Sequence, residues 1–166
     1  MTLLTLFMVT ACGPAEPLLV GVEETTVIAP QRLEGWGTVL RIQVRLENRG
    51  DAPVHVFTDM LQVLGENGSR GTVRDFRDRY RIQQASMVGT ERRGFENMFD
   101  RLGIQGDQVR ELVQAQIAVP AGQVIRRTLP FLLKGAQADT RYALDFVYHD
   151  DATDRITRLN LPVKSQ

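Results

Sequence analysis

Few side chains in this sequence could do chemistry, and the histidines come first. His55 and His149 are the only two, and no second cysteine accompanies Cys12, so the ligands of a usual His/Cys zinc site are missing. Asp150 and Asp151 follow His149 directly, an order that would suit general acid–base catalysis if the side chains converged. Neighbours in an extended chain point to opposite faces, however. The sequence therefore predicts neither a catalytic zinc nor an acid–base pair.

Two weaker patterns could hold a metal ion. Asp150, Asp151 and Asp154 form an acidic corner with Asp145, but the spacing is not that of a calcium-binding loop. A solvated hairpin tip, whose Asp side chains bond their own backbone, explains it better. A copper site could combine His55 with thioethers, which select Cu(I). The methionines concerned are Met60, Met87 and Met98. They form no tight cluster and are more typical of core packing, so we expect no cofactor.

No motif for nucleophilic or phosphate chemistry occurs in the sequence. A Gly-x-Ser-x-Gly elbow is absent, as is a glycine-rich phosphate loop with its lysine. The chain carries 20 basic and 20 acidic residues, so its net charge is zero, and no overall field would hold it on nucleic acid. We therefore expect a protein that is not an enzyme and that has no nucleic-acid partner.

Arginine supplies all the basic residues except Lys134 and Lys164. If residues 76–82 were extended, three guanidinium groups would share one face of a strand. They are those of Arg77, Arg79 and Arg81. Guanidinium forks pair well with carboxylate or phosphate, so this stripe is a candidate site for an acidic envelope protein or an anionic glycolipid. Asp75 and Asp78 leave open the alternative of a solvated, partly neutralised face.

Cys12 ends a short apolar segment at the N-terminus. Residues 3–10 carry no charge and are too few to span a bilayer, but they suit the core of a signal peptide. The order Val-Thr-Ala-Cys over residues 9–12 resembles the lipobox, in which the cysteine thiol receives a diacylglyceryl group. We therefore predict a signal peptide over residues 1–11 and lipidation at Cys12, which would anchor the protein to a lipid bilayer. The other interpretation is a first β-strand that ends in a buried thiol.

The residues after Cys12 favour the anchored interpretation. Residues 13–17 read Gly-Pro-Ala-Glu-Pro, a composition typical of a tether, which we place over residues 12–18. Gly13 occupies the position at which an acidic residue retains many lipoproteins in the inner membrane. We therefore expect a location in the cell envelope, on the outer membrane facing the periplasm.

After the tether, apolar residues recur with a period of two. Leu40, Ile42, Val44 and Leu46 alternate with polar residues, which predicts a strand over residues 39–47 with one buried face. Further strands are predicted over residues 19–28, 54–57, 60–64, 71–73, 113–119, 124–133, 141–149 and 156–163. Turn formers over residues 48–53, 66–69 and 150–154 predict hairpins between the strands that flank them.

One amphipathic helix is predicted over residues 90–102. Thr90 could cap it, and Gly103 would stop it. Its apolar residues at helical spacing are Phe95, Met98, Phe99 and Leu102. A short turn over 107–112 would complete an insertion at 88–112. The 166 residues, 43% of them hydrophobic, then predict one all-β domain over residues 19–166, an antiparallel β-sandwich. Trp36 lies between two glycines. Its indole either fills one end of the sandwich or is exposed and marks a contact site.

Several stretches resemble the immunoglobulin-like domains of unknown function found in bacterial lipoproteins. They are LRIQVRLENRGDAPV at 40–54, LQVLGENG at 61–68, VPAGQ at 119–123 and LPF at 129–131. The chain is more distantly similar to the water-stress domains of late-embryogenesis proteins. The resemblance implies an accessory or binding role outside the cytoplasm. The alternatives are a periplasmic carrier of a small ligand or metal, with 88–112 as a lid, and a structural lipoprotein of a secretion or envelope assembly.

Overall fold

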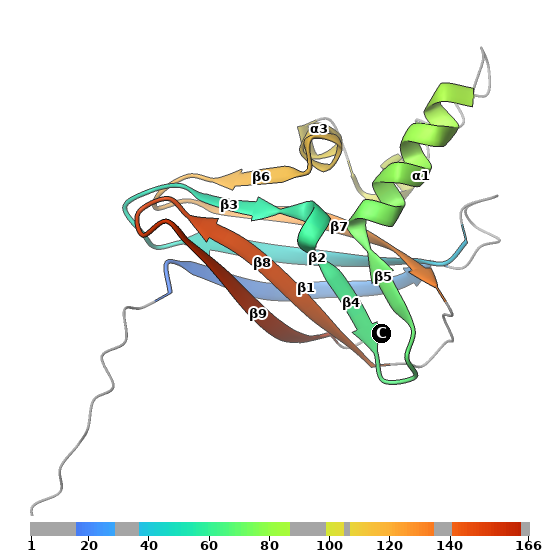
Figure 1. Cartoon of the computed structure of the whole chain (residues 1–166), viewed down its shortest axis with the longest axis horizontal. Helices are drawn as coiled ribbons and strands as arrows, with labels where there is room; N and C mark the ends of the chain where they lie inside the picture. The colour runs from blue at the N-terminus through green and yellow to red at the C-terminus, as the bar shows by residue number, and fades with distance from the viewer. Residues whose placement is uncertain (1–15, 29–36, 87–98, 105–106, 135–140, 164–166) are drawn as a thin grey trace, which may run out of the picture.

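The computed structural model describes residues 16–28, 37–86, 99–104, 107–134 and 141–163. It is mostly antiparallel β-sheet, in agreement with the all-β class (Figure 1). The strands are β1 (Leu18–Ile28), β2 (Val39–Asn48), β3 (Val54–Phe57), β4 (Gln62–Gly65), β5 (Arg70–Thr72), β6 (Gln116–Val119), β7 (Val124–Lys134), β8 (Tyr142–Asp150) and β9 (Arg155–Val163). The helices are η2 (Thr58–Met60), α1 (Val73–Ser86) and α3 (Asp107–Gln114). Every strand expected from the sequence is present, most with ends shifted by one or two residues, but the strand expected over 113–119 begins only at Gln116, because residues 113–114 belong to α3.

The strands form two groups that share one hydrophobic core. In the first group β2 lies between β1 and β7. In the second group β8 pairs with β9 along one edge and with β3 and β4 along the other, and β6 pairs with β3. The β4–β5 hairpin joins the groups, because β4 pairs with β8 while β5 pairs with β7 (Figure 1).

The alternation along β2 confirms the predicted buried face. Leu40, Ile42, Val44 and Leu46 each have 0% of their surface exposed. They pack in one cluster with apolar side chains of β7 and β8. The largest of those are Phe131, Phe146 and Tyr148. Burial of these apolar side chains from both groups removes apolar surface from water and is the main contribution to the stability of the fold.

The predicted hairpin over residues 48–53 is wrong. Both edges of β2 are taken by β1 and β7, so the chain crosses to the second group instead of turning back. The buried Asn48 side chain shapes the crossing. Its Nδ2 donates to Ala52 O at 2.8 Å and to Val119 O at 2.9 Å, and its Oδ1 accepts from Gly50 N at 2.9 Å. By contrast, the hairpins at 66–69 and 150–154 are confirmed.

The extended arginine stripe is also wrong, because residues 76–82 lie inside helix α1. The Oγ1 of Thr72 accepts a hydrogen bond from Asp75 N at 2.9 Å, the pattern of an N-terminal cap. Val73 and Phe76 are buried, and Tyr80 continues the same helical spacing. This apolar face, rather than the alternation of arginines, decides the conformation of the segment.

The predicted insertion is described only in part. Residues 99–102 are helical and end at Gly103, whose φ of 70° confirms the expected stop. Helix α3 confirms the second short turn and lies beside β6 (Figure 1). Arg127 of β7 holds α3 through its Nε and Nη2, which lie 2.5 and 2.8 Å from the carboxylate of Glu111. Residues 90–98 of the expected helix lie outside the described residues.

We expect Val44→Asp to lower the free energy of unfolding by at least about 3 kcal/mol, because the ionised carboxylate would be buried without a partner. Arg45→Asp should lower the free energy of unfolding by less than about 1 kcal/mol, because Arg45 faces solvent. There its Nη2 lies 2.7 Å from Glu47 Oε2. Urea denaturation of both variants measures the difference. Similar midpoints would contradict the register of β2.

Gly71→Ala should lower the free energy of unfolding by roughly 1–3 kcal/mol. A Cβ at this position would lie 2.9 Å from Leu132 O and 2.8 Å from Leu133 Cδ2, too close for either to stay in place. Gly21→Ala is the matched control, because a Cβ there meets no atom closer than 4.0 Å, and it should be neutral or slightly stabilising. Thermal unfolding compares the two. Equal melting temperatures would show that β5 can move away from β7 at little cost.

Candidate functional site

Two polar features lie at opposite ends of the strands. We call the end at which β1 begins the near end. There Arg49 N donates to Pro17 O at 2.7 Å, and the β8–β9 turn is tied to the β2–β3 loop by Asp151 N, which donates to Pro53 O at 3.3 Å (Figure 1). The far end contains the β4–β5 turn, the start of β8 and the end of β9. Strand β8 runs from one end to the other.

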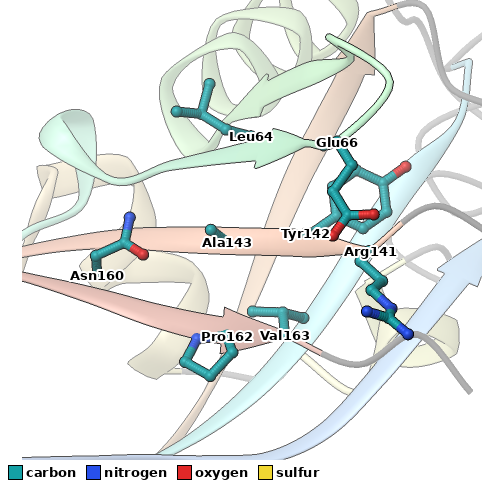
Figure 2. A pocket seen from close by; sticks show the side chains of 9 residues that line it. Leu64, Glu66, Arg141, Tyr142, Ala143, Asn160, Pro162 and Val163 are labelled. Carbon is teal, nitrogen blue, oxygen red and sulfur yellow. The ribbon is translucent and has the colours of Figure 1, made fainter.

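A cavity of about 740 Å³ lies at the far end, on strands β4, β8 and β9 (Figure 2). Leu64, Ala143 and Pro162 are register partners across these three strands and form its apolar floor. Leu64 is 45% exposed, so its side chain is open to solvent at this floor. The volume is within the range of small-ligand sites, roughly 300–1,000 Å³.

Four polar residues line the cavity around this floor. Glu66, Tyr142 and Arg141 lie at one end of the cavity, and Asn160 lies at the other (Figure 2). Glu66 N donates to Arg141 O at 3.1 Å, which fixes the rim. The Tyr142 side chain is only 3% exposed and belongs to the hydrophobic core, on the face of β8 opposite Ala143. Sequence reasoning missed this cavity, because it depends on which strands become neighbours.

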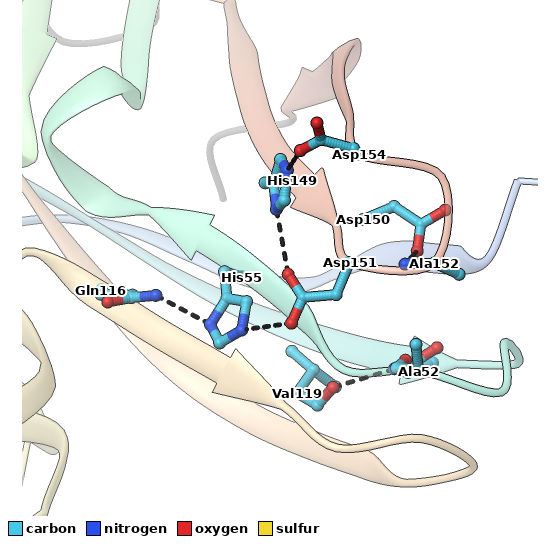
Figure 3. A network of polar contacts seen from close by, with 10 residues as sticks. Ala52, His55, Gln116, Val119, His149, Asp150, Asp151, Ala152 and Asp154 are labelled. Atoms are coloured by element: carbon cyan, nitrogen blue, oxygen red, sulfur yellow. Dashed lines mark hydrogen bonds and ion pairs between the residues drawn. The ribbon is translucent and has the colours of Figure 1, made fainter.

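A second candidate site, at the near end, is a histidine cluster made of His55, His149, Asp151 and Asp154 (Figure 3). The histidines are register partners on β3 and β8. Asp151 bridges them, with its Oδ2 3.0 Å from His55 Nε2 and its Oδ1 3.0 Å from His149 Nδ1. Asp154 Oδ1 lies 2.9 Å from His149 Nε2. The expectation that these neighbours in sequence would not converge is wrong, because the β8–β9 turn directs Asp151 back over the sheet.

Hydrogen bonding sets the tautomer of His55 and favours the charged form of His149. Gln116 Nε2 donates to His55 Nδ1 at 2.8 Å, so His55 Nε2 carries the proton and donates to Asp151. The hydrogen bond with Asp154 is the largest cause that raises the pKa of His149 above its ordinary value; burial, the next largest, lowers it, and Asp151 raises it further. The two carboxylates therefore favour a charged imidazolium at this position.

The acidic corner behaves as a hairpin tip. Asp150 is buried and accepts from Ala152 N at 3.0 Å and from Thr153 Oγ1 at 2.7 Å, the expected bonding of an Asp to its own turn. Among the described residues, no group of three or more His, Cys, Asp or Glu side chains is arranged to hold a metal ion. Met60 is exposed in η2. Met87, Met98 and Trp36 lie outside the described residues.

The candidate arginines do not form a binding surface together. Arg77 is buried and forms ion pairs with Asp59 and Asp78. Arg81 Nη2 donates to Val113 O at 2.8 Å. Arg79 is exposed, two positions from each of the others, so the helix turns it to another side. The stripe is therefore replaced by two arginines that make tertiary contacts and one on a separate face.

The described residues beneath helix α1 enclose only a small void, and residues 88–98 of the expected lid lie outside the described residues. Phe76, Phe99 and Leu112 are among the residues that line a void of only about 10 Å³ there. Tyr80 meets Phe99 edge to face, with ring centroids 4.8 Å apart. A volume this small is less than one water molecule needs, so no ligand fits between the described parts of α1 and α3.

The chain matches no protein family, and no curated protein matches it. A solved target of the Northeast Structural Genomics Consortium is 10% identical, with 89% of this chain and 82% of that one covered and a TM-score of 0.42. The putative ApaA protein from Bordetella pertussis is 12% identical, with 87% of each chain covered and a TM-score of 0.41. Likeness this weak identifies neither a fold family nor a function.

The raised pKa of His149 gives folding a pH dependence of defined sign. Its contribution to stability is fully present below the ordinary value of 6.5 and is lost as the pH rises through the higher folded-state pKa. Wild type should therefore exceed His149→Gln in stability by more at about pH 5.5 than at about pH 8. Urea denaturation at both pH values measures this difference.

Asp154→Asn is the informative companion, because Asp154 has the largest effect on the pKa of His149. Its side chain is 97% exposed, so its loss should leave the fold intact. The variant should lose most of the pH dependence, whereas Asp51→Asn, at an exposed aspartate nearby, should keep it. An unchanged pH profile in Asp154→Asn would contradict the role of this carboxylate.

Proposed function

We propose that the protein is a bacterial lipoprotein whose immunoglobulin-like β-sandwich is a non-enzymatic binding module in the cell envelope. Cys12 carries the acyl chains, and the domain faces the periplasm from the outer membrane. Its partner is another component of the envelope. The cavity at the far end is the surface through which it binds.

The position of the cavity relative to the start of β1 carries this proposal. Strand β1 begins at Leu18, six residues after Cys12, so an extended tether reaches at most about 20 Å. The near end would then face the bilayer, and the cavity, at the other end of β8, would face away from it. A binding module needs this orientation to meet partners across the periplasm.

The sandwich part of the proposal is supported by the pairing pattern. Two groups of antiparallel strands contribute apolar side chains to one core, and the chain passes between the groups at the β2–β3 loop. Crossings between groups are typical of Greek-key sandwiches. No helix among the described residues is long and apolar enough to cross a membrane. Attachment would therefore come from the lipid on Cys12.

The surroundings of the histidines support a role other than catalysis. Their partners in the described part of the chain are carboxylates and Gln116, and no Ser, Thr or Cys side chain is within hydrogen-bond distance of either ring. A nucleophile activated by a histidine base requires such a contact.

A palmitate analogue fed to cells should label the wild type and not Cys12→Ala, because the thioether on the thiol is the first step of acylation. Thr10→Ala, which keeps a small residue within the lipobox, should label like the wild type. Fractionation should place the labelled protein in the outer membrane. Equal, unlabelled and soluble protein in all three cases would overturn the anchor.

The cavity also favours a second function, that of a small-ligand carrier. Its volume suits a ligand of modest size, and its floor is apolar. Native mass spectrometry of gently purified protein separates the two functions. A stoichiometric adduct indicates a carrier, and a bare mass together with a co-purified protein indicates an interaction module.

A further inference from the structure

We propose that the far-end cavity binds a small zwitterion with an apolar side chain, namely an α-amino acid or a short apolar peptide. Glu66 takes the ammonium group, Arg141 takes the carboxylate, and the side chain lies on the floor formed by Leu64, Ala143 and Pro162. This assignment rests on the proposed binding function of the cavity, for which it names the ligand class.

Opposite charges at the rim without an ion pair are the first observation. The backbones of Glu66 and Arg141 are hydrogen-bonded at 3.1 Å, yet their side chains form no ion pair with each other or with any other described residue. A guanidinium fork matches a carboxylate in geometry, and a carboxylate accepts readily from an ammonium group. A ligand with only one sign of charge would be repelled by one of the two residues.

The floor and the size of the cavity decide the rest of the ligand. Leu64 is 45% exposed, and Ala143 and Pro162 extend the apolar surface beside it. Covering this surface with an apolar side chain removes it from water. Asn160, at the opposite end, offers an amide to a second residue of a peptide. A zwitterionic lipid headgroup shares the charges, but in the proposed orientation the cavity faces away from the anchoring bilayer.

Calorimetric titration of the full chain carrying Cys12→Ala tests the assignment. Leucine and leucyl-leucine should bind. Leucinamide lacks the carboxylate and N-acetyl-leucine lacks the ammonium group, and each should bind roughly ten- to a hundredfold more weakly than leucine. Serine should also bind more weakly, because it cannot cover the floor.

Two variants assign the charges. Glu66→Gln should weaken leucine about as much as N-acetylation does, and it should leave the affinity for N-acetyl-leucine unchanged. Arg141→Gln should weaken the binding of leucine about as much as removal of the carboxylate does, and it should leave the affinity for leucinamide unchanged. Arg155→Gln, an exposed arginine at the other end of β9, is the matched control and should bind like the parent. Circular dichroism melts verify that all variants are folded.

Several outcomes would overturn the proposal. They are no binding of any of these ligands at millimolar concentration, equal binding of free and blocked leucine, and variants that bind like the parent. Binding to vesicles of phosphatidylethanolamine but not to leucine would also overturn it and assign the site to a lipid headgroup. The labelling of Cys12 is an independent measurement, so a failed anchor and a failed ligand class are distinguishable.

Discussion

The backbone of β5 lies so close to that of β7 that position 71 accepts only a residue without a Cβ, and both strand groups depend on this contact. A side chain at Gly71 would collide with Leu132 O and Leu133. Three register pairs connect β5 with β7, and helix α1, which follows β5, packs against β7 and adds the ion pair between Asp75 and Lys134. Because β4 also pairs with β8, this hairpin connects the two groups, which share one hydrophobic core.

Strand β8 determines where the two candidate sites, the cavity and the histidine cluster, lie. Its first residues bring Tyr142 and Ala143 between β4 and β9, which creates the cavity, and its last residues bring His149 beside His55. Neither feature is local. The cavity floor is a row across three strands, and the histidine cluster combines β3, β8 and the β8–β9 turn. Both appear only when the register of β8 is fixed on its two edges.

Local patterns were enough to predict the strands and the β4–β5 and β8–β9 hairpins, but not the pairings between strands distant in the sequence. The alternation from Leu40 to Leu46 predicts a buried face. The Asn-Gly sequence at Gly68, whose φ is 80°, predicts a hairpin. The segment at 76–82 has two competing periodicities, and burial of Val73 and Phe76 decided for the helix. The contact between His55 and Asp151 joins residues 96 positions apart, so no spacing in the sequence could reveal it.

The two sites lie at opposite ends of β8 and should act independently. Seven residues separate Tyr142 from His149, which in a strand is about 23 Å, well beyond the range over which contacts couple directly. Coupling over such a distance requires an element with two discrete arrangements that both sites bias. Strand β8 is instead buried along most of its length and paired on both edges, so it offers one arrangement. Protonation of His149 should therefore change the stability of the near end and leave the cavity at the far end unaltered.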